Sequence, residues 1–136
     1  MNSMPAQPGA AGDVAYILVV EDELLVRMMV SDALREAGWN VIEAYNADEA
    51  IVILSSGVPV DLVLSDVRMP GTMDGLGLLE FMSARYPELP VIIMSGHLAP
   101  QEALDKGARH FLSKPYSCDL ALTLVEQELA RGDDAR

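Results

Sequence analysis

The sequence predicts a single three-layer α/β/α domain with a five-stranded parallel sheet. Its 136 residues are the length of one ordinary domain. Hydrophobic residues make up 51% and charged residues 22% of the chain, a balance typical of a packed globular protein. Short apolar runs alternate with amphipathic stretches, and parallel strands need such helical crossovers, which cover both faces of the sheet.

The elements are expected in strict alternation along the chain. The first strand, Ala15–Val20, is continuously apolar, as in a strand buried on both faces, and the first helix, Glu23–Ala37, precedes Gly38, which suits a left-handed C-terminal cap. The same strand signal recurs at Val41–Ala44, Leu62–Ser65, Val91–Met94 and Phe111–Ser113. Further helices are expected at Ala47–Ser55, Gly75–Tyr86, Pro100–Lys106 and Cys118–Ala130. This gives a domain over residues 15–131, with flexible tails at 1–14 and 132–136.

Composition and charge argue against several functional classes. Nine Lys and Arg residues against 21 Asp and Glu residues give a net charge of −12, which repels nucleic acid phosphates and anionic membrane surfaces. The single cysteine, Cys118, cannot form an internal disulfide, and no Cys/His cluster has zinc-site spacing. No signal peptide, transit peptide or membrane span is recognisable. We therefore expect a cytoplasmic protein with no direct contact to nucleic acid or membrane.

Charged and hydroxyl side chains gather at the predicted carboxyl ends of the strands, where open parallel sheets bind ligands. Glu21 and Asp22 follow the first strand, Asp66 the third, Ser95 the fourth and Lys114 the fifth. Carboxylate oxygens suit Mg²⁺, and a lysine can hold a phosphoryl oxygen. Such close carboxylates should raise the pKa of at least one of them when no metal is bound. Taken singly, each residue also fits a turn, cap or surface role, so it is their joint placement that indicates a site.

Four motifs in order extend this interpretation to a family. From about Tyr16 to Arg131 the sequence resembles the receiver domains of bacterial two-component response regulators, in their stand-alone, chemotaxis-regulator-like form. The motifs are ILVVEDE (Ile17–Glu23), LVLSDVRMPGTMDG (Leu62–Gly75), VIIMSGH (Val91–His97) and FLSKPY (Phe111–Tyr116). The resemblance implies a flavodoxin-like (βα)5 fold with strand order 2-1-3-4-5.

The resemblance also implies a role for each strand-end residue. Asp66 would accept a phosphoryl group from a sensor histidine kinase or a histidine phosphotransfer protein. Ser95 would hydrogen-bond that group and take part in switching, and Lys114 would pair with it. The Mg²⁺ site would be formed by Glu21, Asp22, Asp66 and the backbone carbonyl of Arg68.

Other family positions carry both matches and departures. The Lys114–Pro115 bond falls where the family usually has a cis peptide. Phe111 occupies the position of the switch aromatic but lacks the hydroxyl of the commoner tyrosine. The loop Met69–Gly75 is one residue longer than usual. Arg68 and His97 flank the site at positions that tune phosphate hydrolysis in the family.

The predicted function is that of a single-domain response regulator rather than a conventional enzyme. It would promote its own phosphorylation and dephosphorylation and signal to a downstream protein target, because only Gly132–Arg136 follow the last expected helix. Two apolar lines on that helix, Ala121-Leu124-Val125 and Leu122-Val125-Leu129, leave open a homodimer formed through it.

Three other classes compete with this interpretation. A haloacid-dehalogenase-type phosphatase would carry an Asp-x-Asp nucleophile motif where this chain has Glu21-Asp22-Glu23, and would need a cap. A flavin or nucleotide binder would need a glycine-rich or hydroxyl-rich loop at that place, where the sequence is acidic. A receiver that only docks partners, without being phosphorylated, remains open on the sequence alone.

Overall fold

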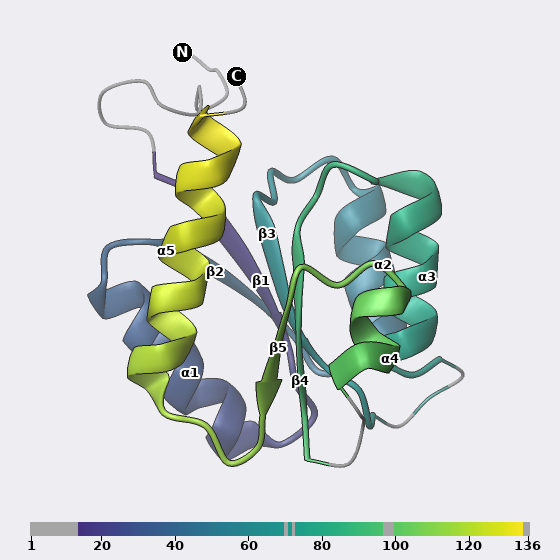
Figure 1. Cartoon of the computed structure of the whole chain (residues 1–136), viewed down its shortest axis with the longest axis horizontal. Helices are drawn as coiled ribbons and strands as arrows, with labels where there is room; N and C mark the ends of the chain where they lie inside the picture. The colour runs from purple at the N-terminus through teal and green to yellow at the C-terminus, as the bar shows by residue number, and fades with distance from the viewer. Residues whose placement is uncertain (1–13, 70, 72, 97–99, 135–136) are drawn as a thin grey trace.

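The computed structural model describes residues 14–69, 71, 73–96 and 100–134. Within them, strands and helices alternate from β1 to α5 (Figure 1). The strands are β1 (Tyr16–Val20), β2 (Asn40–Ala44), β3 (Leu62–Asp66), β4 (Val91–Ser95) and β5 (His110–Ser113). The helices are α1 (Leu24–Glu36), α2 (Ala47–Ser55), α3 (Gly75–Arg85), α4 (Pro100–Asp105) and α5 (Cys118–Asp134).

The five strands form one parallel sheet in the order β2-β1-β3-β4-β5, which confirms the predicted fold and strand order. The register aligns the carboxyl ends of neighbouring strands. Val20 of β1 lies opposite Ser65 of β3, and Ser95 of β4 lies opposite Ser113 of β5. The residues that follow these strands therefore emerge side by side at one edge of the sheet.

Two hydrophobic cores lie on the two faces of the sheet. Helices α1 and α5 cover one face, and α2, α3 and α4 cover the other (Figure 1). Alternate residues of β1 divide between them, with Ile17 and Val19 in the first core and Leu18 and Val20 in the second. Each such buried side chain stabilises the fold by roughly 1.5–3 kcal/mol, so the central strands anchor both helical layers.

Local capping determines where several helices begin and end. The Asn46 side chain accepts a hydrogen bond from the Glu49 amide at 2.8 Å, and the Glu49 carboxylate accepts one from the Tyr45 amide at 2.9 Å, which together cap α2. The Asp74 side chain caps α3 by accepting from the Gly77 amide at 2.9 Å. Gly38, with φ 105°, follows α1 as the predicted left-handed cap.

Gly75 allows α3 to begin directly against the end of β3. A Cβ atom at this position would overlap the Asp66 carbonyl oxygen and lie 2.7 Å from Val67 Cα. The Gly75 amide donates to the Val67 carbonyl oxygen at 2.8 Å. Because Gly75 has no side chain, the first turn of α3 can pack directly against the backbone at the end of β3, which includes Asp66.

The last helix is longer than predicted. It continues past Ala130 to Asp134, so residues 132–134 of the expected C-terminal tail are helical. Within this helix Arg131 pairs with the buried Glu128 one turn earlier at 3.5 Å. The expected N-terminal tail falls, apart from residue 14, outside the described residues. Across the residues that the structure describes, no helix has the length and apolar character to cross a membrane.

Candidate functional site

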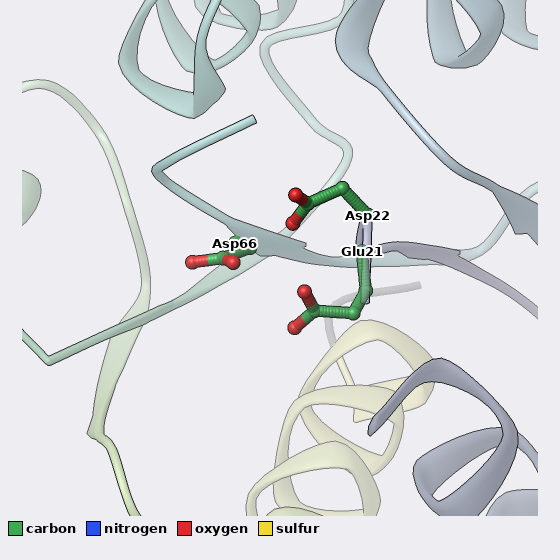
Figure 2. Close-up of side chains that lie close together, drawn as sticks. All are labelled: Glu21, Asp22 and Asp66. Atoms are coloured by element: carbon green, nitrogen blue, oxygen red, sulfur yellow. The ribbon is translucent and has the colours of Figure 1, made fainter. Parts of the chain in front are cut away.

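Three carboxylates meet at the carboxyl edge of the sheet, as the sequence predicted. Figure 2 shows Glu21 and Asp22 directly after β1 and Asp66 at the end of the neighbouring β3. Carboxylate oxygens from all three lie within 4.8 Å of one another. Glu21 is completely buried and Asp66 is 6% exposed, whereas Asp22 is exposed. Two of the three charges are therefore held away from water.

The Lys114 ammonium supplies the counter-charge for the two buried carboxylates. Its Nζ donates to Glu21 Oε1 at 3.0 Å and to Asp66 Oδ2 at 2.9 Å. Burial lowers the pKa of Lys114, but the hydrogen bonds and charges of Asp66 and Glu21 raise it to about 12 overall, so the side chain is charged at neutral pH. The Lys114–Pro115 peptide is cis, which confirms the family expectation.

Glu21 carries the raised pKa that crowding of the carboxylates predicted. Burial is the main cause, and it raises the pKa from 4.5 to about 7 although the Lys114 hydrogen bond opposes it. The charge of Asp66 adds to the increase. The direction of the prediction is thus confirmed, but desolvation contributes more than the repulsion between like charges.

The site opens into a cavity of about 320 Å³. It is lined by Asp22, Glu23, Asp66, Arg68, Ser95, Gly96 and Lys114. Ser95 is 3% exposed at the end of β4, and its carbonyl oxygen accepts from the Lys114 amide at 2.9 Å, which fixes the lysine loop beside that strand. The predicted catalytic residues Asp66, Ser95 and Lys114 therefore share one cavity. His97 lies outside the described residues.

Phe111 lies apart from this cavity. Its half-buried side chain packs against the core beneath α2, α3 and α4 and does not line the cavity. The structure thus places it in the core on the sheet face that α2, α3 and α4 cover. The roles of Phe111 in switching and of the Arg68 carbonyl in metal binding stay predictions.

Several hydrogen bonds that hold the strand ends of the site in place were not predicted from the sequence. Arg27 Nη1 donates to the Glu21 carbonyl oxygen at 2.8 Å, and Arg27 Nε pairs with Glu43 at 3.1 Å. Ser65 Oγ donates to the Asp66 carbonyl oxygen at 2.9 Å, and the Val67 amide donates to Asp66 Oδ1 at 2.7 Å. The position of Arg27 in the first helix, about one turn after Glu21 and Asp22, is the sequence feature that could have predicted its contact with Glu21.

The pKa of Glu21 predicts a specific pH dependence of stability in the absence of metal. Between pH 4.5 and about 7 the folded chain keeps a proton on Glu21 that the unfolded chain has released. Rising pH through this window therefore lowers the free energy of unfolding. In EDTA, the melting temperature of the wild type should fall by roughly a few degrees relative to that of Glu21→Gln as the pH rises. A difference between the two proteins that is constant over the window contradicts the assignment.

Comparisons with known proteins agree with this geometry. The model of the response regulator receiver domain family matches residues 17–126. The chain is 41% identical over 117 residues to the DNA-binding transcriptional regulator NtrC of Salmonella typhimurium, a match that covers 84% of this chain and 24% of that protein. It is 36% identical over 115 residues to the putative response regulator NtrX-like of Rickettsia felis, a match that covers 82% of this chain and 24% of that protein. The chain thus spans about a quarter of the length of these curated relatives.

Solved structures show the same architecture. The receiver domain of NtrX from Brucella abortus superposes with a TM-score of 0.78 at 35% identity, covering 84% of this chain and 98% of that one. A response regulator receiver domain protein from Methanospirillum hungatei shares the fold, with a TM-score of 0.84 at 23% identity over 91% of this chain and 100% of that one. The fold, the acidic cavity and the family match lead to one conclusion: the chain belongs to the response regulator receiver domain family.

Proposed function

We propose that Asp66 accepts a phosphoryl group from the phosphohistidine of a sensor histidine kinase or phosphotransfer protein. The observation that carries this proposal is the buried Asp66 carboxylate, which lies beside an acidic pair and is hydrogen-bonded to the Lys114 ammonium. A carboxylate so placed has a cation to receive the charge of an incoming phosphoryl group, and it borders a cavity through which that group can enter.

The acidic cluster fits Mg²⁺. Glu21, Asp22 and Asp66 offer hard oxygen ligands within 4.8 Å of one another, and the exposed Asp22 leaves room for the waters that Mg²⁺ retains. When bound, the ion neutralises charge on the phosphoryl oxygens. The carbonyl of Arg68 is proposed as a further ligand.

The chain's own residues account for the remaining chemistry. An Asp66 carboxylate oxygen attacks phosphorus, the bond between phosphorus and the donor's ring nitrogen breaks, and the electron pair stays on that nitrogen. Lys114 then pairs with a phosphoryl oxygen, and the Ser95 hydroxyl donates to another. Attack of water on phosphorus later releases inorganic phosphate and restores the Asp66 carboxylate. The chain thereby promotes both formation and loss of its own acyl phosphate.

Phosphorylation should depend on Asp66 alone. Incubation with Mg²⁺ and acetyl phosphate should add the mass of one phosphoryl group to the wild type and none to Asp66→Asn, because an amide is not a nucleophile toward phosphorus. Asp61→Asn is the matched control, since Asp61 precedes β3 at the other edge of the sheet and binds the Tyr16 amide at 2.8 Å. A labelled Asp66→Asn protein contradicts the assignment. A wild type that stays unlabelled under intact mass measurement favours a docking module without phosphorylation.

The donor protein docks, in this proposal, on an apolar surface of α1. The α1 surface consists of Leu24, Leu25, Met28 and Met29, which are 56%, 79%, 46% and 60% exposed. It begins one residue after Glu23, which lines the cavity. A protein that brings a histidine to Asp66 can therefore contact the first turns of α1, where exposed apolar side chains provide it with a binding surface.

The α1 surface can be tested against a small donor that needs no docking. Leu25→Glu should lower the ratio of the phosphorylation rate with a phosphohistidine protein to the rate with acetyl phosphate by about tenfold, since the variant would bury an unpaired carboxylate in an apolar contact. Val52→Glu is the control, because Val52 is 67% exposed on α2, against the opposite face of the sheet. Stopped-time phosphotransfer assays measure both ratios, and equal ratios for the two variants contradict the docking surface.

Signalling to a downstream protein completes the proposal. The proposal includes that the protein acts as a single-domain response regulator and that it is located in the cytoplasm. The relative NtrC is a DNA-binding regulator, but this chain matches only 24% of its length, and the net charge of −12 argues against nucleic acid contact by the chain itself.

Both apolar lines predicted on α5 pack toward the core, with Ala121 and Val125 fully buried, so a homodimer through α5 is not needed to explain them.

A further inference from the structure

Arg27 is joined to the acidic cluster through the backbone rather than through a carboxylate of the cluster. It lies near the start of α1, and its side chain is only 17% exposed. Arg27 Nη1 donates to the Glu21 carbonyl oxygen at 2.8 Å, and Arg27 Nε pairs with Glu43 of β2 at 3.1 Å. The planar guanidinium is therefore held at two points, and a fork held in this way keeps a defined orientation.

The pairing with Glu43 is not what distinguishes Arg27. Arg35, about two turns further along α1, also pairs with Glu43, at 3.0 Å, and so connects the same helix to the same strand. Within the described residues, the hydrogen bonds of Arg35 go to Glu43 and to the Val41 carbonyl oxygen. The two arginines thus share one carboxylate partner, and the bond to the Glu21 carbonyl belongs to Arg27 alone among them.

The Glu21 carbonyl is part of the peptide that leads into Asp22. Because a peptide is planar, the direction of this carbonyl also sets the direction of the Asp22 amide and the place of the Asp22 Cα atom. The Glu21 amide, for its part, donates to the Ala44 carbonyl oxygen at 3.0 Å. Both polar groups of the Glu21 backbone are therefore held, one by β2 and the other by α1.

Asp22 is the acid that depends most on this peptide. Its side chain is exposed, and within the described residues no hydrogen bond or ion pair holds its carboxylate. The carboxylates of Glu21 and Asp66, in contrast, both accept from Lys114. Figure 2 shows the Asp22 side chain turned toward Asp66. The backbone at the end of β1 is thus the main support that places Asp22 in the cluster.

We propose that Arg27 positions the acidic pair for Mg²⁺ by fixing the peptide between Glu21 and Asp22. Arg27 is a positioning residue, because it acts through a backbone carbonyl. The inference rests on the proposed function, which assigns the acidic cluster to Mg²⁺. Charge alone has the opposite effect, since removing a positive charge near three carboxylates should strengthen the binding of a cation. Loss of positioning should weaken it.

The test is a calorimetric titration of the full chain with Mg²⁺ alone. Arg27→Met keeps an aliphatic side chain and removes every donor, and it should raise the dissociation constant of Mg²⁺ by about tenfold, as the loss of a group that orients a metal ligand usually does. Arg35→Met is the matched control, since it removes the same charge and the same bond to Glu43. Its dissociation constant should stay within about twofold of the wild type, because the charge of a half-exposed arginine is screened by salt.

Thermal melts in EDTA separate positioning from stability. A purely structural role for Arg27 lowers the melting temperature of Arg27→Met and leaves its dissociation constant for Mg²⁺ equal to that of Arg35→Met. Such equality, or tighter binding by Arg27→Met, overturns the inference and leaves the proposed function intact. A wild type that binds no Mg²⁺ overturns both the inference and the metal site of the proposed function.

Arg27→Lys decides the question if circular dichroism in EDTA shows that Arg27→Met does not fold. The lysine keeps the charge but has no fork with which to hold Glu21 and Glu43 together. Charge alone therefore predicts the wild-type dissociation constant for Mg²⁺, whereas positioning by the guanidinium predicts a higher one. An unchanged constant in Arg27→Lys then overturns the inference.

Discussion

The Lys114 ammonium between Glu21 and Asp66 is the interaction on which the rest of the site depends. Two carboxylates that are almost completely buried carry like charges, and holding them close together is unfavourable unless a cation lies between them. Lys114 provides that cation at 2.9 to 3.0 Å from both. The same lysine is also the group best placed to respond when new negative charge appears on Asp66. In the proposed function, the stability of the empty site and its sensitivity to phosphorylation therefore have one physical origin.

The fold brings these groups together by a few constraints on the backbone. Parallel pairing of β1, β3, β4 and β5 places their carboxyl ends at one edge, so groups that lie 93 residues apart in sequence, Glu21 and Lys114, form a hydrogen bond. The absence of a side chain at Gly75 lets α3 press on the end of β3, and Arg27 holds the Glu21 carbonyl. The backbone that carries Glu21 and Asp66 is thus held by several contacts, and the site opens into the cavity.

Much of this arrangement could be predicted from the sequence because parallel topology converts chain order into spatial neighbours. Asp66 and Lys114 were placed in one site from strand ends alone, and most element ends differ from expectation by no more than one residue. Three features could not be predicted in this way. The contact of Gly75 with Asp66 depends on interatomic distances, and the pairing of Arg27 depends on a rotamer. The continuation of α5 through Gly132 runs against the low helix propensity of glycine.

The most direct test of the account follows the Lys114 ammonium itself. The chain has two lysines, and Lys106 pairs with the exposed Glu80 at 2.7 Å away from the site, so it serves as an internal reference in ¹⁵N spectra of lysine side chains. Addition of Mg²⁺ and the phosphoryl mimic beryllofluoride is expected to shift the Lys114 signal, to leave the Lys106 signal in place, and to have no such effect in Asp66→Asn. A Lys114 signal that is the same with and without bound mimic would show that the lysine does not respond to charge on Asp66, and would contradict the account.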